Sequence, residues 1–168
     1  AMPRRPIAFL TMDSLEGFVA YDHLAVTPLN QLGWEVVDVP WRTKDTVWDD
    51  FVAVVIRTPW DYHHYIDEFL QVLERIEASR AKLLNPLNVV RWNIDKHYLR
   101  ELEAGGARIV PTSWITSPTV VDFQTARMTF GCDELVIKPV EGSGGYGIVF
   151  GPEASEKELS TIRQKVAA

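Results

Sequence analysis

The segment Val136-Ile137-Lys138-Pro139-Val140-Glu141-Gly142-Ser143-Gly144-Gly145-Tyr146-Gly147 combines a short apolar run, a lysine and a loop with four glycines. Glycine lets the backbone approach a ligand closely and turn successive N–H groups inward, which forms a nest for anionic oxygens. The same composition is also typical of an ordinary β-hairpin. It is not a Walker A loop, because no Lys-Ser or Lys-Thr pair follows the glycines. The loop alone therefore leaves phosphate binding and a plain hairpin both open.

Lys138 favours the first interpretation, because it interrupts the apolar run that begins at Leu135. An unpaired lysine is costly to bury, whereas a lysine beside a phosphate nest supplies a compact positive charge. The alternative is a solvent-facing lysine on an edge strand, which Pro139 makes plausible. Loop and lysine together predict a phosphate site formed by Lys138, Ser143, Gly144, Gly145 and Gly147.

Lys96 is a second cation that needs an explanation. We expect Asn93 to cap a helix that runs through Glu103 and ends at Gly105-Gly106. A positive charge in the first turn of that helix would oppose the helix dipole, and an anionic ligand nearby would offset the opposition. The alternative is a solvated lysine that is balanced by Asp95.

Composition limits the class of protein. The chain has 168 residues, of which 46% are hydrophobic and 24% charged, as in ordinary globular proteins. The net charge of -6 argues against a nucleic-acid surface, which needs clustered Lys and Arg. The single cysteine, Cys132, rules out a disulfide within the chain and is compatible with a reducing cytoplasm. No apolar run approaches the roughly 20 residues of a membrane span. We therefore expect a cytoplasmic protein without nucleic-acid or membrane partners. The composition leaves open whether the protein forms a homodimer.

The first half of the chain predicts strands that alternate with helices. Apolar runs and Val-rich alternation predict strands at Ile7–Leu10, Trp34–Val39, Phe51–Ile56 and Lys82–Leu84. Helical spacing predicts helices over Leu24–Leu32 and Ile66–Ile76. Pro28 either opens the first helix after Thr27 or kinks a longer one. This order predicts an α/β fold with an open, parallel, doubly wound sheet.

The second half predicts a smaller α+β arrangement. The expected elements are a strand at Arg108–Thr112, a helix from Ser117 or Thr119 to Phe130, strands at Leu135–Val140 and Tyr146–Phe150 on either side of the glycine loop, and helical spacing at Leu159 and Ile162. We expect four tryptophans to pack in the core rather than to form a stacking platform: Trp34, Trp41, Trp48 and Trp60.

Three polar residues follow predicted strands and are candidates for substrate binding. Arg57 and Asp61 follow the third strand, and Asp13 follows the first; ligands of open α/β sheets bind outside the carboxyl ends of strands. Arg57 could hold a substrate carboxylate bidentately. The alternative is an Arg57–Asp61 ion pair that shapes the loop. The pair His63-His64 predicts no metal site, because adjacent side chains rarely face one metal and no further His or Cys cluster supports them.

Several short runs together resemble the ATP-grasp proteins, and the similarity is greatest to the glutathione-synthetase-like branch that includes the cyclo-ligase of cycloserine biosynthesis. These runs are Arg57–Tyr62, Asn85-Pro86, Val90–Asn93, Asp95-Lys96, Tyr98-Leu99, Leu102, Pro111-Thr112 and Val136–Pro139. The resemblance extends from about Ile7 to Phe150. It implies a pre-ATP-grasp α/β domain over residues 1–88, followed by the small first lobe of an ATP-grasp domain over residues 89–168, incomplete at the C-terminus.

The resemblance also implies a chemistry. Lys96 and Lys138 would contact the phosphates or the adenine edge of ATP, and Ser143–Gly147 would close over the β- and γ-phosphates. The implied partners are ATP and a small carboxylate substrate, which is activated as an acyl phosphate and attacked by an amine or a similar nucleophile. Mg²⁺ would bridge the phosphates and stabilise their charge.

One departure from the family pattern limits this expectation. The second lobe of the family carries acidic magnesium ligands that include a Glu-x-Asn pair, but this sequence has no Asn after Asn93. We therefore expect that the chain does not catalyse by itself. A non-catalytic nucleotide- or small-molecule-binding module of the same fold is the alternative. A Rossmann dinucleotide enzyme is disfavoured, because no Gly-x-Gly-x-x-Gly follows the first strand.

Overall fold

The computed structural model describes residues 5–115, 123–142, 144–145 and 147–151. The chain divides into two compact units, Ala1–Ile94 and Asp95–Ala168, and each is described by itself. The boundary that the sequence suggests, between residues 88 and 89, lies inside helix α3 (Leu87–Asn93), which belongs to the first unit.

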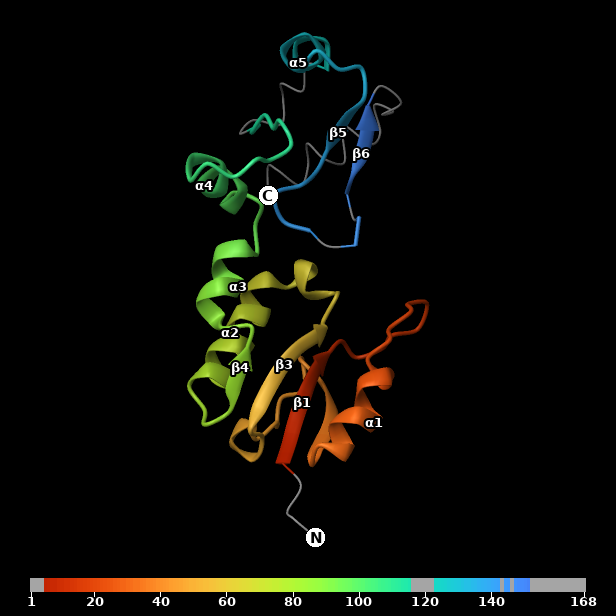
Figure 1. The fold of residues 1–168 in the computed structure, drawn as a ribbon, viewed down its shortest axis with the longest axis vertical. Coiled ribbons are helices and arrows are strands. Elements are labelled where there is room, and N and C mark those ends of the chain that lie inside the picture. The colour runs from red at the N-terminus through yellow and green to blue at the C-terminus, as the bar shows by residue number, and fades with distance from the viewer. Residues whose placement is uncertain (1–4, 116–122, 143, 146, 152–168) are drawn as a thin grey trace. The chain divides into compact units, whose positions relative to one another are not determined.

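The first unit is built on a parallel sheet of four strands in the order β2-β1-β3-β4 (Figure 1). Its strands are β1 (Arg5–Thr11), β2 (Trp34–Pro40), β3 (Ala53–Thr58) and β4 (Lys82–Leu84). Phe9 in β1 pairs with Asp38 on one side and with Val55 on the other, so β1 is central. The predicted α/β class and the parallel sheet are confirmed.

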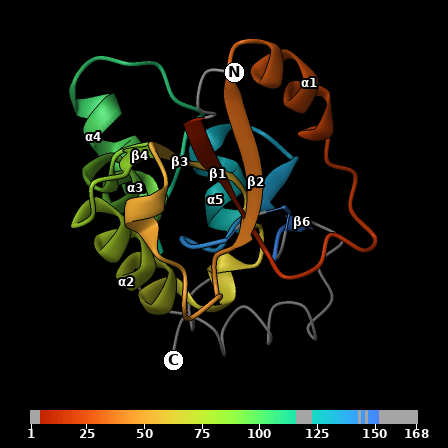
Figure 2. The same cartoon turned by 90° about the horizontal axis from the view of Figure 1, so that it is seen from below.

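Helices cover both faces of this sheet. α1 (His23–Gln31) joins β1 to β2, and α2 (Ile66–Glu77) joins β3 to β4. Both crossovers are expected to be right-handed, and they run in opposite directions across the sheet, so the two helices lie on opposite faces (Figure 2). Pro28 lies inside α1, whose N-cap is Asp22, so Pro28 does not open the helix after Thr27.

The core of the first unit lies between α2 and the sheet. The face of α2 that the sequence predicts is apolar is indeed buried, with Phe69, Leu73 and Ile76 at most 2% exposed. Trp41 and Trp48 are buried as expected, and Trp60 packs against the same cluster. Trp34 is only half-buried and lies under the guanidinium of Arg5, 3.8 Å from the ring centroid.

Two helices replace the single one that was expected after Asn93. Asn93 is the last residue of α3, and α4 (Tyr98–Ala104) begins only after His97 and ends at Gly105. The prediction that Asn93 is an N-cap is therefore wrong. Pro86, which lacks an N–H, is the N-cap of α3, so a helix begins about two turns earlier than the sequence pattern suggests.

The second unit contains α5 (Phe123–Phe130) and an antiparallel pair, β5 (Leu135–Ile137) and β6 (Val149–Gly151). Both strands are shorter than predicted, and Lys138 follows β5 instead of lying within it. The strand expected at residues 108–112 is absent: this segment pairs with no strand among the described residues, and Val110 is 81% exposed. Ser117, Thr119, Leu159 and Ile162 lie outside the described residues.

The described part of the chain contains no helix with the length and hydropathy needed to cross a membrane.

Candidate functional site

Lys96 lies between α3 and α4 and is held against the base of the glycine loop. Its backbone N–H donates to the carbonyl of Val140 at 3.0 Å. Its ammonium Nζ donates to the same carbonyl at 3.1 Å and to that of Gly142 at 3.5 Å. Asp95 and Glu141 form an antiparallel β-bridge beside these contacts. Lys96 is therefore fixed by tertiary contacts. Because no helix begins at Asn93, the argument that the charge of Lys96 opposes the dipole of such a helix does not apply.

Lys96 interacts electrostatically with Lys138 and with two carboxylates. Burial lowers the pKa of the Lys96 ammonium below the ordinary 10.5, and the positive charge of Lys138 lowers it further. Asp95 and Glu141 act in the opposite direction. Lys138 itself is exposed. Two cations that are far apart in the sequence thus influence each other in the second unit.

The glycine loop adopts backbone conformations that favour glycine. Gly144, Gly145 and Gly147 have φ angles of +60°, +82° and +71°, in the left-handed region that other residues rarely enter. A turn closes the loop, in which the N–H of Ile148 donates to the carbonyl of Gly145 at 3.2 Å. Ser143, the remaining member of the predicted phosphate site, lies outside the described residues.

We expect Gly147→Ala to destabilise the second unit more than Gly144→Ala does. Both substitutions place an L-residue in the left-handed region, which costs about 1 kcal/mol. Only at Gly147 would the new Cβ also meet a neighbour, Pro139 Cγ at 3.2 Å, whereas nothing lies within 4 Å at Gly144. Urea unfolding of the two variants measures the difference, and equal losses would show that the Pro139 contact is irrelevant.

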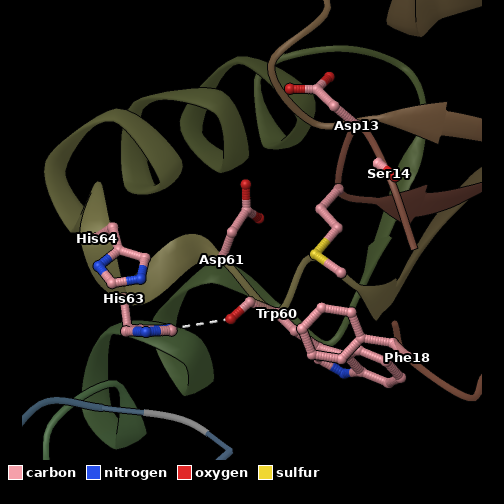
Figure 3. Close-up of a pocket in the computed structure, with 8 residues that line it drawn as sticks. Asp13, Ser14, Phe18, Trp60, Asp61, His63 and His64 are labelled. Carbon is pink, nitrogen blue, oxygen red and sulfur yellow. Dashed lines mark hydrogen bonds between the residues drawn. The ribbon is translucent and has the colours of Figure 1, made fainter. Parts of the chain in front are cut away.

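The first unit carries a separate group of candidates, at the carboxyl ends of β1 and β3. A cavity of about 270 Å³ opens there, lined by Met12, Asp13, Ser14, Phe18, Trp60, Asp61, His63 and His64 (Figure 3). A second cavity, of about 500 Å³, is lined by Val19, Ala20, Tyr21, Asp22, Leu24, Ala25, Arg57, Thr58 and Trp60. The structure therefore places Asp13 and Asp61 together and Arg57 apart from them, with Trp60 lining both cavities.

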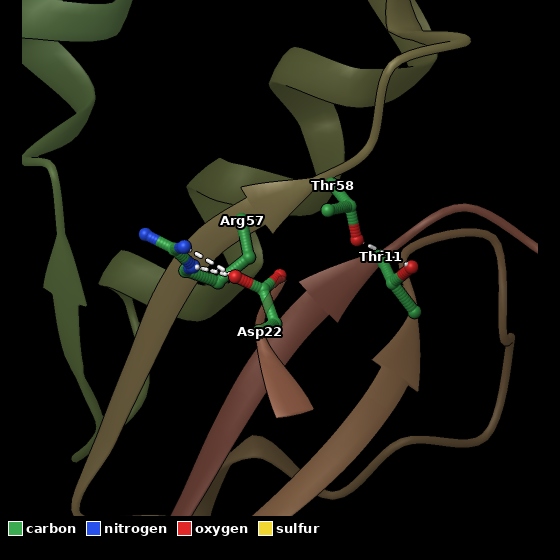
Figure 4. A network of polar contacts seen from close by, with 4 residues as sticks. All are labelled: Thr11, Asp22, Arg57 and Thr58. Carbon is green, nitrogen blue, oxygen red and sulfur yellow. Dashed lines mark hydrogen bonds and ion pairs between the residues drawn. The ribbon is translucent and has the colours of Figure 1, made fainter. Parts of the chain in front are cut away.

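Arg57 is paired with Asp22, a residue that the sequence reasoning missed. Its Nε donates to Asp22 Oδ1 at 2.8 Å, and its Nη2 donates to the same oxygen (Figure 4). The alternative of an Arg57–Asp61 pair is therefore wrong. The loop after β1 returns to the sheet and places the N-cap of α1 beside the end of β3, a long-range contact that no local pattern reveals.

A buried tryptophan holds the side chain of Asp61 by a hydrogen bond. The indole Nε1 of Trp41 donates to Asp61 Oδ1 at 2.7 Å, and Trp41 is fully buried. The ends of the two neighbouring strands are joined as well, since the buried hydroxyl of Thr58 donates to that of Thr11 at 2.7 Å. The hydrogen bond from Trp41 thus orients the Asp61 side chain at the edge of the 270 Å³ cavity.

The two adjacent histidines contact each other and the backbone. Their ring centroids are 4.0 Å apart, and Nδ1 of His63 lies 2.9 Å from the carbonyl oxygen of Trp60. Within the described residues, no group of three or more His, Cys, Asp or Glu side chains could hold a metal ion.

Comparison with known proteins identifies the class. Residues 7–85 match the family model for the N-terminal domain of D-cycloserine synthetase DcsG, and residues 110–168 match that of a circularly permuted ATP-grasp. These matches confirm that the chain resembles the ATP-grasp proteins, as the sequence motifs suggest.

Individual relatives show which ATP-grasp proteins this chain is similar to. The chain is 36% identical over 113 residues to the cycloserine biosynthesis protein DcsG of Streptomyces lavendulae, which covers 64% of this chain and 36% of the relative. The crystal structure of D-cycloserine synthetase DcsG superposes with a TM-score of 0.77 at 26% identity, over 96% of this chain and 56% of that one. A RimK-domain ATP-grasp protein from Sphaerobacter thermophilus shares the fold, with a TM-score of 0.65 at 16% identity over 95% and 59% of the two chains. The chain thus spans about a third of the curated relative.

Proposed function

We propose that this chain forms the ATP-binding portion of an ATP-dependent carboxylate–amine ligase that acts through an acyl phosphate. The observation that carries the proposal is the position of the Lys96 ammonium, which donates to the carbonyls of Val140 and Gly142 at the base of a loop with left-handed glycines and interacts electrostatically with Lys138. Two like charges that interact electrostatically repel each other, and a polyanion that lies between them offsets this repulsion. The matches to ATP-grasp families support the nucleotide as that polyanion.

Different residues of the second unit would bind different parts of the nucleotide phosphates. The ammonium groups of Lys96 and Lys138 would neutralise phosphate oxygens as compact charges. The backbone N–H groups of Ser143, Gly144, Gly145 and Gly147 would hold further oxygens in a nest. Mg²⁺ would accompany the nucleotide and screen its phosphates. The described residues offer no cluster that fits a metal ion, so we assign no step to it.

The first unit would hold the second substrate outside the carboxyl ends of β1 and β3. Asp13, Asp61 and Arg57 remain the candidates; Asp13 and Asp61 line one cavity, and Arg57 lines the other. Arg57 already forms an ion pair with Asp22, so a substrate carboxylate would have to compete with the Asp22 carboxylate for the guanidinium. A cytoplasmic location, where ATP is available, is part of the same proposal. Because the 168 residues contain no Asn beyond Asn93, we also propose that they complete no turnover by themselves.

Calorimetric titration of the chain with Mg-ATP tests the proposal. We expect weak binding that Lys138→Met reduces about fivefold at low ionic strength, because an exposed charge contributes about 1 kcal/mol. Lys82→Met is the matched control: it removes an exposed lysine from β4, in the first unit, and should change nothing. Equal affinities of the wild type and Lys138→Met would refute the assignment of the phosphate site.

A further inference from the structure

We propose that the 270 Å³ cavity binds the cationic amino group of a small substrate. This cavity lies outside the carboxyl ends of β1 and β3, and the described residues that line it all belong to the first unit. The inference depends on the proposed function only where it calls the bound amine a substrate of the ligase. The binding of an amine as such stands on the lining of the cavity.

The charge of the lining selects a cation. Two carboxylates, Asp13 and Asp61, line the cavity, and none of the described residues that line it is a lysine or an arginine. Arg42 interacts electrostatically with Asp13, but it also forms a 3.6 Å ion pair with Glu68 and lies 4.2 Å from the centroid of the Tyr65 ring. Its charge is therefore shared with another carboxylate, and the cavity keeps a negative balance.

Asp61 has the geometry of a fixed acceptor. One of its oxygens accepts from the fully buried indole of Trp41, which holds the carboxylate in one orientation. Figure 3 shows the side chain of Asp61 projecting into the space between His64 and Asp13. Among the described residues the other oxygen, Oδ2, has no hydrogen-bond partner, so it can accept from an ammonium at no cost to the Trp41 contact. An acceptor that is oriented in advance loses little freedom on binding.

The opposite side of the cavity is aromatic. The rings of Phe18 and Trp60 pack together with centroids 5.5 Å apart, and both line the cavity beside Met12 (Figure 3). The face of an aromatic ring attracts a cation, and the ring surface also accommodates the apolar carbons of a small amine. A carboxylate pair combined with an aromatic surface fits a primary ammonium on a short carbon chain. It does not fit an anion of the same size.

The neighbouring 500 Å³ cavity has a different character, which supports this assignment. Its only lysine or arginine among the described lining residues is Arg57, and Asp22 neutralises that guanidinium. It therefore offers a closed ion pair, whereas the described lining of the smaller cavity offers two carboxylates and no lysine or arginine.

An NMR titration of the full chain tests the inference with three four-carbon probes of similar size: n-butylammonium chloride, sodium butyrate and 1-butanol. We expect n-butylammonium to shift the backbone amide signals of residues 12–14, 60 and 61 in a saturable way, while butyrate leaves them unchanged and 1-butanol binds more weakly. Butyrate shifts of equal size, or no saturation by the amine, would overturn the assignment.

Asp61→Asn sharpens this test, because asparagine keeps an oxygen that can accept from Trp41 while the charge is lost. We expect it to weaken butylammonium binding about tenfold. Asp45→Asn removes an exposed charge outside the cavity and should have no effect. Unchanged binding in Asp61→Asn would contradict the proposal. The nucleotide titration with Lys138→Met reports on the other unit, so failure of the amine site and failure of the ATP site are distinguishable.

Discussion

Trp41→Ala is expected to lower the free energy of unfolding by about 3–5 kcal/mol, the range for a buried aromatic residue. Trp41 is fully buried and packs edge-on against Phe69, with ring centroids 5.4 Å apart. Its loss leaves a cavity in the core between α2 and the sheet. It also removes the donor to Asp61, so a half-buried carboxylate loses its anchor.

Urea unfolding followed by far-UV circular dichroism measures this loss without depending on tryptophan fluorescence. Trp92→Ala is the comparison, because Trp92 is 41% exposed and its replacement should cost less than that of the fully buried Trp41. Trp41→Phe keeps most of the ring but not the N–H, and it should fall between the two. If Trp41→Ala and Trp92→Ala were equally stable, the core would be centred elsewhere.

Lys96→Met is expected to weaken Mg-ATP binding about ten- to a hundredfold, because a hydrogen bond from a charged group contributes about 1.5–3 kcal/mol. The effect should exceed that of Lys138→Met, since Lys96 is less exposed and its charge is less screened by water. Lys96 also donates to the carbonyls of Val140 and Gly142, so its loss frees the base of the glycine loop.

The pH dependence of ATP binding gives a second measure of Lys96. Burial and the charge of Lys138 lower the pKa of its ammonium below 10.5, so the charge is lost at a lower pH than on an ordinary lysine. Only the protonated form attracts phosphate, and affinity should therefore fall as the pH rises through this lowered pKa. Lys96→Arg stays charged throughout and should give a flatter profile. Parallel profiles for the two proteins would exclude Lys96 from the phosphate site.

Much of the first unit could be predicted from sequence because its signals are local. The spacing of Phe69, Leu73 and Ile76 marks a helix with one buried face, and that face is buried in the structure. The apolar runs of β1 and β3 likewise mark strands covered on both sides. The second unit was less predictable. There, the apolar segment at residues 108–112 suggests a strand, but no described strand pairs with it.

In the candidate sites, likewise, the sequence indicated the residues but not their arrangement. Residue type alone selected Lys96, Lys138 and the loop glycines, because few other residues suit a phosphate nest. It did not reveal their arrangement: Lys96 was expected on a helix after Asn93, yet it is held by Val140, 44 residues away. The sequence did not predict Asp22 as a site residue, although its carboxylate neutralises the guanidinium of Arg57.

The sequence by itself determined the α/β class, the positions of α2 and of the four strands in the first unit, and the glycine loop with its lysines, because burial periodicity and backbone freedom are properties of neighbouring residues. Only the tertiary structure decided which charges meet. Arg57 lies 35 residues from Asp22, and Trp41 lies 20 residues from Asp61, so these contacts exist only once the sheet has brought the strand ends together. The polarity of each cavity follows from those contacts, and a linear pattern does not contain them.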